Sequence, residues 1–279
     1  MTAPTQARET DNGRYYTDPS PAFDGALYPS VTNVLSVGVN KPALVPWATK
    51  ITAEYAFDHL LDLMAEAVVD RPTALKRLKA QVRAVKDDAA DLGSRVHAAA
   101  ERHNLGLPMD AEPDVEAFTR QYLAWLESWG VDLEADMEAS EASVVHRGIG
   151  YAGTFDLLVW LRSGIERARE LWLIDFKTSS KRPVTSIYEE HVLQLAALRH
   201  AKTVWLPGGG EARMPMADRC AVLNLRRGTH ALLEVPADRD AFVAFQGALA
   251  TTRFIHGIDL KSAVRQVEAP KPVAVEGAV

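Results

Sequence analysis

The stretch Gly153-Thr154-Phe155-Asp156, followed by Ile174-Asp175-Phe176-Lys177-Thr178, places two carboxylates and one lysine on two apolar segments typical of β-strands. Because side chains alternate along a strand, Asp175 and Lys177 face one side and Phe176 the other. Charged side chains on the inward face of a strand are costly unless they bind something. Two acids beside a lysine suit a divalent cation and the phosphate that the cation activates.

The flanking residues predict a hairpin. Apolar residues 157–160 continue the first strand, apolar residues 171–174 lead into the second, and the polar stretch 162–170 is typical of a hairpin loop. Antiparallel pairing around that loop would bring Asp156 close to Asp175. The alternative is a surface hairpin with an incidental Asp-x-Lys pattern, and the Gly-Thr-x-Asp strand before it argues against that alternative.

Further blocks along the chain resemble the PD-(D/E)XK nuclease superfamily, in its RecB-like, CRISPR-associated-type phage exonuclease branch. That branch has a helix with a histidine, a strand ending in Gly-Thr-x-Asp, a strand with Asp-x-Lys, and a helix with Gln-x-x-x-Tyr. This chain has the stretch Leu92-Gly93-Ser94-Arg95-Val96-His97, then Asp156, then Asp175 with Lys177, then Gln194. The stretches 28–32 and 42–47 are also similar to phage members, so the resemblance covers roughly residues 28–236. Leu198 departs from it, standing where the family often has tyrosine.

The resemblance implies an α/β fold with a restriction-endonuclease-like core, a mixed central sheet flanked by helices, and an N-terminal helical elaboration. It implies a metal-dependent deoxyribonuclease that hydrolyses DNA phosphodiester bonds. Among such enzymes it favours an exonuclease that acts in phage or bacterial DNA recombination or repair. The alternatives are a structure-specific DNA endonuclease and a non-cleaving, DNA-binding recombination accessory protein on a nuclease fold. Asp156, Asp175 and Lys177 together argue against a decayed site.

The implied metal site consists of Asp156, Asp175, the backbone carbonyl of Phe176 and His97. A carboxylate-rich set of this kind favours Mg²⁺ or Mn²⁺ over Zn²⁺. One or two such ions would neutralise phosphate charge and lower the pKa of a bound water. A histidine at the edge of an apolar helix stripe, such as His97, is more often a hydrogen-bonded core residue. The resemblance instead favours the ligand role for His97.

The expected catalytic residues are Asp156, Asp175, Lys177 and Gln194. Lys177 would orient the attacking water, stabilise developing charge, and accept a proton if burial depresses its pKa. Gln194 lies on an apolar helix face, where it needs a partner. That partner is either the backbone, or the scissile phosphate or a metal-bound water. Glu141, where the family often has a glutamate, is expected as an outer-shell metal residue or a partner of Lys177.

The net charge of −6 does not point to nucleic acid, so the local distribution of charge has to decide. Six basic residues and no acid lie between Arg71 and Lys86. One helix face there is expected to contact DNA phosphates, or else to be a solvated surface; it carries Lys76, Lys79, Arg83 and Lys86. The same two alternatives hold for Lys181 and Arg182, which directly follow the second strand.

The composition is that of a globular protein, with 279 residues, 47% hydrophobic and 24% charged. No apolar run reaches the length of a membrane span, and residues 1–12 lack a signal-peptide core. We therefore expect a cytoplasmic protein, in the bacterial host cytosol if a phage encodes it. Cys220 is the single cysteine, which excludes an internal disulfide and the four-cysteine iron–sulfur cluster of some relatives.

The expected organisation is a polar, extended or loosely ordered arm over 1–27, a nuclease domain over 28–260, and a mobile tail over 261–279. The domain would comprise a helical elaboration (about 40–135), a catalytic core (about 136–236) and a last helix (about 239–254). Helices are predicted near 46–69, 73–103, 113–129 and 186–202, and strands near 139–146, 152–161, 171–178, 219–225 and 231–235. The expected partners are DNA and a recombination or single-strand-annealing protein, and the sequence leaves the oligomeric state undecided.

Overall fold

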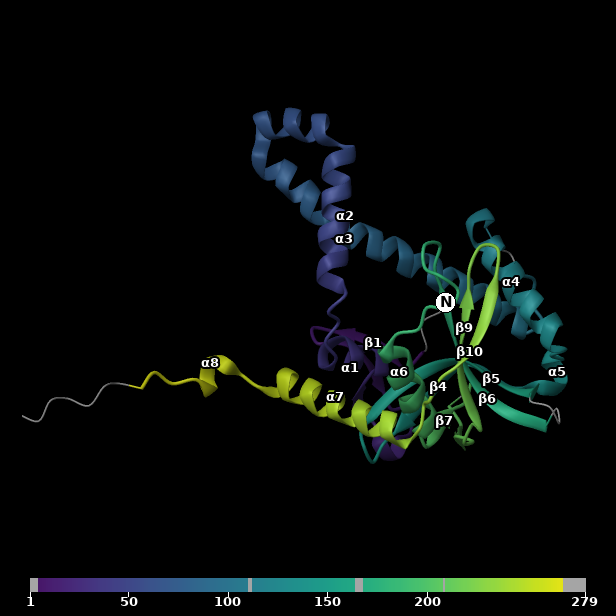
Figure 1. Ribbon diagram of the computed structural model, residues 1–279. Helices are drawn as coiled ribbons and strands as arrows, with labels where there is room; N and C mark the ends of the chain where they lie inside the picture. The colour runs from purple at the N-terminus through teal and green to yellow at the C-terminus, as the bar shows by residue number, and fades with distance from the viewer. Residues whose placement is uncertain (1–4, 110–111, 164–167, 208, 268–279) are drawn as a thin grey trace, which may run out of the picture.

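The computed structural model describes residues 5–109, 112–163, 168–207 and 209–267. The central sheet consists of β4 (Met137–His146), β5 (Tyr151–Ser163), β6 (Ala168–Thr178), β7 (Thr203–Trp205), β8 (Glu211–Arg213), β9 (Arg219–Leu225) and β10 (His230–Glu234). Its strand order is β10-β9-β6-β5-β4-β7-β8 (Figure 1). Strands β6 and β9 run parallel, and the other neighbours run antiparallel. The predicted hairpin is therefore present, although part of its loop, 164–167, lies outside the described residues.

Helices cover both faces of the sheet. One face, here called the α6 face, is covered by α1 (Val31–Gly38), α6 (Glu189–His200) and α7 (Arg239–Gly257). The opposite face, here called the α4 face, is covered by α4 (Pro113–Trp129) and the last turns of α3 (Leu60–Asn104). The short helix α5 (Leu133–Asp136) precedes β4, and the exposed short helix α8 (Leu260–Ala263) lies beyond the end of α7, away from the sheet (Figure 1). The predicted fold class, a mixed sheet flanked by helices with an N-terminal helical region, is confirmed.

Strand β6 shows why this sheet is central. Its residues from Leu171 to Phe176 are all buried, as expected for a strand with helices on both faces. Leu171 and Leu173 pack on the α6 face, whereas Ile174 and Phe176 pack on the α4 face. The predicted orientation of Phe176 away from the two charged neighbours follows from this alternation.

The N-terminal residues differ from the expected loosely ordered arm. From residue 7 they form an antiparallel sheet of β1 (Ala7–Thr10), β2 (Gly13–Thr17) and β3 (Leu27–Pro29), with a single 3₁₀ turn, Pro21–Phe23, before β3. Tyr16 packs on Trp205 of the central sheet, with ring centroids 6.2 Å apart. Buried Asp18 accepts a hydrogen bond of 2.7 Å from Arg147. The polar composition of this segment led to the wrong prediction, because the sheet is held to the domain by a few buried aromatic residues and by polar contacts with distant parts of the chain.

The N-terminal helical region is a projecting arm of α2 (Leu44–Asp58) and the first half of α3 (Figure 1). The predicted break before residue 73 is present, because Asp70 has non-helical angles of φ −146° and ψ 87°. The Asp70 carboxylate accepts hydrogen bonds from the Thr73 backbone and hydroxyl, so it caps the helix that follows. A second break at His59 was not predicted, since no proline or glycine marks it.

Three smaller differences concern lengths. Helix α6 begins at Glu189 rather than near 186, and the short strands β7 and β8 were missed. The predicted mobile tail begins with α8, and residues 268–279 lie outside the described part. None of the helices in the described ranges is long and apolar enough to span a bilayer.

Candidate active site

Strands β4, β5 and β6 meet α3 and α6 around a cavity of about 180 Å³. Six of the residues singled out from the sequence line it: His97, Glu141, Asp156, Asp175, Lys177 and Gln194. They come from five separate elements, so folding brings residues that are far apart in the sequence into one cavity. All six lie on the described part of the chain, and their roles remain predictions.

The β5–β6 hairpin sets the two aspartates against each other. Leu157 pairs with Ile174, and the same antiparallel register places Asp156 opposite Asp175. The Asp156 carboxylate also accepts a 2.5 Å hydrogen bond from the backbone N–H of Phe176. The proximity predicted for the two carboxylates is therefore present.

An irregularity at Asp156 reverses the alternation of side chains between the two faces of the sheet along β5. Phe155 packs on the α6 face, yet Leu157, two residues on, packs on the α4 face. In a regular strand both would face the same side. Opposite this point Glu141 of β4 has a φ of 48°, and it is the one non-glycine residue with positive φ among the described ranges. The irregularity lets Asp156 and Glu141 reach His97, which comes from the α4 face.

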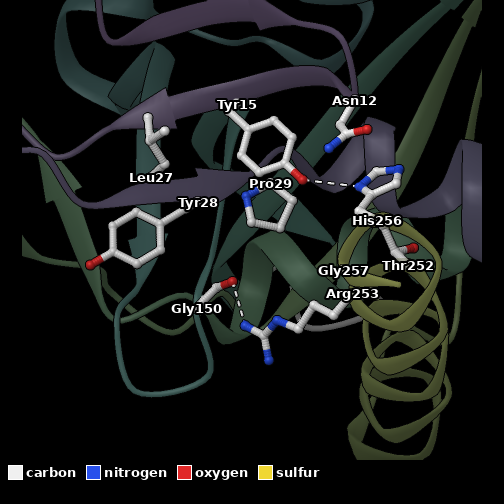
Figure 2. A pocket seen from close by; sticks show the side chains of 10 residues that line it. All are labelled: Asn12, Tyr15, Leu27, Tyr28, Pro29, Gly150, Thr252, Arg253, His256 and Gly257. Atoms are coloured by element: carbon white, nitrogen blue, oxygen red, sulfur yellow. Dashed lines mark hydrogen bonds between the residues drawn. The ribbon is translucent and has the colours of Figure 1, made fainter. Parts of the chain in front are cut away.

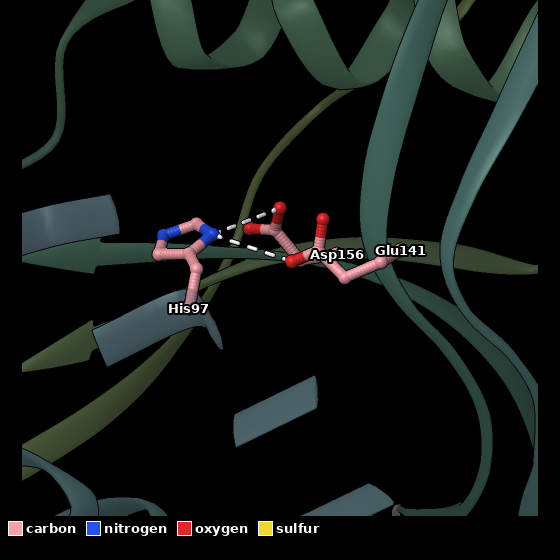
Figure 3. Close-up of side chains that lie close together, drawn as sticks. All are labelled: His97, Glu141 and Asp156. Carbon is pink, nitrogen blue, oxygen red and sulfur yellow. Dashed lines mark ion pairs between the residues drawn. The ribbon is translucent and has the colours of Figure 1, made fainter. Parts of the chain in front are cut away.

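His97, Glu141 and Asp156 form a candidate metal site, in which each offers a ligand atom within 4.8 Å of the others (Figure 3). His97 Nδ1 lies 3.2 Å from Asp156 Oδ1 and 3.5 Å from Glu141 Oε1. His97 Nε2 lies 3.1 Å from the carbonyl oxygen of Phe176. Because a carbonyl can only accept, Nε2 carries a hydrogen, and the second ring nitrogen is directed at the carboxylates.

These three residues suit a divalent cation. His97 Nδ1 and Glu141 Oε1 are buried and have no hydrogen-bond partner. Buried acceptors without partners are rare in proteins unless something binds them. A divalent metal ion would satisfy both atoms, since carboxylate oxygen and imidazole nitrogen are both common metal ligands. The Phe176 carbonyl, expected as a ligand, instead receives the His97 ring, and its ligand role stays a prediction.

The charges in this triad depend strongly on one another. Burial raises the pKa of Glu141 to about 7, and the charge of Asp156 adds to that effect. Burial would lower the pKa of His97, but the two carboxylates outweigh it and raise this pKa to about 10. The site therefore keeps a positive charge between its acids by holding a proton on the imidazole. Metal ligands must be deprotonated, so a bound cation would displace that proton.

Asp175, Lys177 and Gln194 form a second cluster beside the triad. Lys177 Nζ lies 2.6 Å from Asp175 Oδ2, and it donates a hydrogen bond of 3.2 Å to Gln194 Oε1. Gln194 Nε2 donates to Asp175 Oδ1 at 2.7 Å. Of the two alternatives for Gln194, the backbone partner is absent, and the side chain instead fixes both charged groups.

The proton-acceptor role expected for Lys177 depended on a pKa lowered by burial, and the charges around the side chain oppose that lowering. Burial would lower the pKa of Lys177, but the charges of Asp175 and Asp156 outweigh burial and raise it. For Asp175, burial raises the pKa although Lys177 opposes this. Lys177 is therefore an ammonium group, able to donate hydrogen bonds and to stabilise negative charge.

Leu198, which departs from the family pattern, is 1% exposed and packs at the edge of the cavity. A Cβ atom on Gly153 would lie 2.8 Å from Leu198 Cδ2, which is closer than carbon atoms approach. The glycine of the Gly-Thr-x-Asp block thus makes room for this leucine.

The N-terminal sheet supplies cavity residues that sequence reasoning missed. Arg14 and Tyr16 of β2 and Thr32 of α1 line the same cavity. The Tyr16 hydroxyl lies 2.9 Å from Thr154 Oγ1, next to the Asp156 block. Arg14 and Tyr16 lie in the segment 1–27, which was taken for an arm outside the domain. Thr32 lies in the stretch 28–32, which was part of the resemblance but was given no role.

The residues expected to contact DNA lie outside the cavity. Lys76, Lys79, Arg83 and Lys86 are exposed along α3, where Arg83 also pairs with Asp87 at 3.4 Å. Lys181 and Arg182 are exposed on the loop after β6. Their contacts with DNA stay predictions.

A second cavity of about 410 Å³ lies between the N-terminal sheet and α7 (Figure 2). Within it the Tyr15 hydroxyl lies 3.0 Å from His256 Nδ1, and Arg253 donates to the carbonyl of Gly150 at 2.8 Å. None of its described lining residues is a carboxylate. It is larger than the acidic cavity but lacks groups that would hold a divalent cation.

No protein-family profile matches the chain, and no curated protein matches it either. Among solved structures, a crystal structure titled SSO0001 matches with 16% sequence identity and a TM-score of 0.31. That match covers 60% of this chain and 74% of the other. A likeness at this level does not bear on function, which has to be argued from the site.

Proposed function

We propose that this protein is a metal-dependent deoxyribonuclease with a PD-(D/E)XK-type core, acting as an exonuclease in phage or bacterial DNA recombination or repair. The observation that carries the proposal is the meeting of two clusters in one cavity. The His97–Glu141–Asp156 triad offers ligands to a cation, and the ammonium group of Lys177 lies beside it. A cation site next to a fixed positive charge suits the hydrolysis of a phosphodiester better than other reactions.

In this proposal His97, Glu141 and Asp156, with Asp175, would hold Mg²⁺ or Mn²⁺. When bound, such an ion neutralises phosphate charge and makes water a better nucleophile. Lys177 donates hydrogen bonds to a phosphate oxygen and stabilises the charge that develops there. Gln194 holds Asp175 and Lys177 in place, and the Phe176 carbonyl fixes the ring of His97. Cys220, the single cysteine, supports a cofactor of this kind over an iron–sulfur cluster.

DNA is the proposed substrate because exposed basic residues lie on the same molecule as the acidic cavity. Phosphate contacts from such residues would position a strand without reading its sequence. The proposed partners are therefore DNA and a recombination or single-strand-annealing protein. A structure-specific endonuclease and a non-cleaving accessory protein are the outcomes against which the proposal is tested.

The test is digestion of end-labelled linear DNA beside covalently closed circular DNA, with Mg²⁺ and with a chelator. An exonuclease shortens the linear DNA only in Mg²⁺ and leaves the closed circle intact. Nicking of the circle would replace the exonuclease by an endonuclease. Binding without cleavage of either DNA would contradict a hydrolytic function. Asp156→Asn is the matched control, because it keeps the side-chain shape and removes the charge.

A further inference from the structure

The strand ladder is interrupted where it carries the two carboxylates of the candidate metal site. In the described part of the sheet, β4 and β5 pair on both sides of this point but skip one pair, Glu141 with Asp156. Strand β6 first pairs with β5 one residue further along, at Leu157. Asp156 is nonetheless buried, and buried backbone groups need hydrogen-bond partners. Something other than the ladder must therefore hold the backbone here.

A chain of three side chains takes the place of the missing ladder contact. The Ser140 hydroxyl donates a hydrogen bond of 3.1 Å to the backbone carbonyl of Asp156. The Asn104 amide nitrogen donates to Ser140 Oγ at 2.9 Å. The Tyr122 hydroxyl in turn donates to Asn104 Oδ1 at 2.5 Å. These residues, here called the Tyr122–Asn104–Ser140 chain, run from α4 across α3 to β4 and end on β5.

The chain is shielded from water over most of its length. Tyr122 is fully buried, Asn104 is 6% exposed and Ser140 is half-buried. The Tyr122 ring also packs against Phe176, with ring centroids 5.3 Å apart, so the far end of the chain is fixed in the core. Removing one member of a buried polar chain leaves its neighbours unpaired, which is costly. The chain is therefore a fixed connection between the elements it joins.

The elements joined by the chain are those that carry the three residues of the metal site. Asn104 lies seven residues, or about two helical turns, after His97 on the same helix. Ser140 directly precedes Glu141 on β4. The carbonyl that receives the last hydrogen bond belongs to Asp156 itself. A displacement anywhere along the chain would thus alter the distances among the three ligand atoms.

We propose that Asn104 and Ser140 are positioning residues for the cation site. They hold α3, β4 and β5 in the arrangement in which His97, Glu141 and Asp156 converge, and they do so without contacting the cation or the substrate. This role rests on the proposed function, because it requires that the triad binds a divalent cation. Replacing residues that orient metal ligands typically costs about 10- to 100-fold in metal affinity.

Titration of the metal-free full chain with Mg²⁺, followed by calorimetry, tests the role without DNA. Ser140→Ala and Asn104→Leu should each raise the Kd for Mg²⁺ by about 10- to 100-fold. Ser140→Thr keeps the hydroxyl and should retain the wild-type Kd. All titrations are made at a temperature at which the metal-free variants are folded, as their melting curves establish. A merely structural role would lower the melting temperature and leave the Kd of the folded protein unchanged.

A pair of tyrosine variants separates positioning from a general loosening of the core. Tyr151 is fully buried like Tyr122, and its hydroxyl donates a single hydrogen bond of 2.8 Å to the carbonyl of Ala197, on the α6 face. Tyr122→Phe and Tyr151→Phe should both lower the melting temperature, because each loses one buried hydrogen bond. Only Tyr122→Phe should raise the Kd for Mg²⁺.

The outcomes that contradict the role are distinct from those that contradict the proposed function. A wild-type Kd in Ser140→Ala would overturn the positioning role alone, and this variant decides the matter if Asn104→Leu does not fold. A Kd raised as much by Tyr151→Phe as by Tyr122→Phe would also overturn the role. Wild-type protein that binds neither Mg²⁺ nor Mn²⁺ would overturn the role and the proposed function together.

Discussion

At the scale of single residues, Glu141 is the most unusual feature of the site. A non-glycine residue held at positive φ costs about 1–3 kcal/mol, and Glu141 also carries a buried carboxylate. We expect Glu141→Gly to raise the melting temperature of the metal-free protein, because it removes both the backbone strain and the buried carboxylate. Glu141→Gln relieves only the charge, so the difference between the variants measures the strain.

The same two variants report on cation binding. In wild-type protein Mg²⁺ should raise the melting temperature more at pH 8 than at pH 6, because Glu141, with a pKa of about 7, is ionised only at the higher pH. Both variants should lose most of this Mg²⁺-induced shift. A full shift in Glu141→Gln would remove Glu141 from the set of ligands.

Lys177 supports a different prediction now that its pKa is raised rather than depressed. Lys177→Ala should keep the Mg²⁺-induced thermal shift but lose roughly 10²- to 10³-fold in cleavage rate, the range for one donor to developing charge. Because the ammonium group stays charged, the wild-type rate should show no titration of this residue between pH 7 and 9. A rate that rises with pH in wild type, and no longer does so in the variant, would restore the proton-acceptor role.

At the scale of elements, β5 and α6 meet at Gly153 and Leu198. Leu198→Ala should cost about 2–5 kcal/mol in the free energy of unfolding, as other buried leucines do. Gly153→Ala alone should also destabilise, since its new methyl group would meet Leu198 Cδ2 at 2.8 Å. In the double variant the methyl group occupies space that the leucine has left, so its cost should fall below the sum. If chemical denaturation shows that the two losses of unfolding free energy simply add in the double variant, Gly153 and Leu198 do not interact.

Helix α6 also carries a group that links stability to pH. Burial, helped by the charge of Lys177, lowers the pKa of His191 to about 4. The unfolded chain binds this proton near pH 6.5 and the folded chain does not, so stability is present above pH 6.5 and is lost as pH falls toward 4. The full loss amounts to about 3 kcal/mol. His191→Phe should flatten the dependence of unfolding free energy on pH over this interval. Equal slopes in wild type and His191→Phe would show that His191 protonates within the fold.

At the scale of the whole molecule, the exposed basic stripe of α3 supports a test of the proposed DNA binding. Neutralising Lys76, Lys79, Arg83 and Lys86 together should flatten the dependence of log affinity on log salt by up to about 0.7–0.9 for each phosphate that the variant no longer neutralises. Base preference should not change, because phosphate contacts carry no base information. Binding is measured in Ca²⁺, to limit cleavage.

The control neutralises four exposed basic residues far from the arm: Arg213, Arg239, Lys261 and Arg265. Its salt slope should match that of the unchanged protein. A stripe variant with an unaltered slope would place the DNA path elsewhere, with Lys181 and Arg182 the next residues to neutralise.

Local sequence patterns were sufficient to predict the hairpin and its two aspartates. Alternation along β6 and the break before Thr73 depend on neighbouring residues, which the sequence displays directly. The N-terminal sheet could not be predicted, because contacts such as that of Asp18 with Arg147 join distant polar residues. The positive φ of Glu141 was equally hidden, since glutamate has no preference for that conformation and the surrounding ladder imposes it.

The grouping of the site was only partly foreseen for the same reason. The order of blocks named residues that the fold brings into one cavity, but it ranked Glu141 below Asp175 as a ligand. In three dimensions the turn of β5 at Asp156 brings Glu141 to His97 and leaves Asp175 with Lys177. The division of the site residues into two clusters results from how the strands and helices pack, so it cannot be predicted from the spacing of residues along the chain.

The distances along the chain between these partners also set an order of assembly. The hydrogen bond from Phe176 to Asp156 spans 20 residues, whereas that between His97 and Phe176 spans 79. Contacts that close short loops form early in folding, and those that close long loops form late. We expect hairpin amides to gain protection from hydrogen exchange before His97 docks during refolding. Affinity for Mg²⁺ should then appear only in the last kinetic phase, so that partly folded chains remain unable to attack DNA. Metal binding that develops together with hairpin protection would contradict this order.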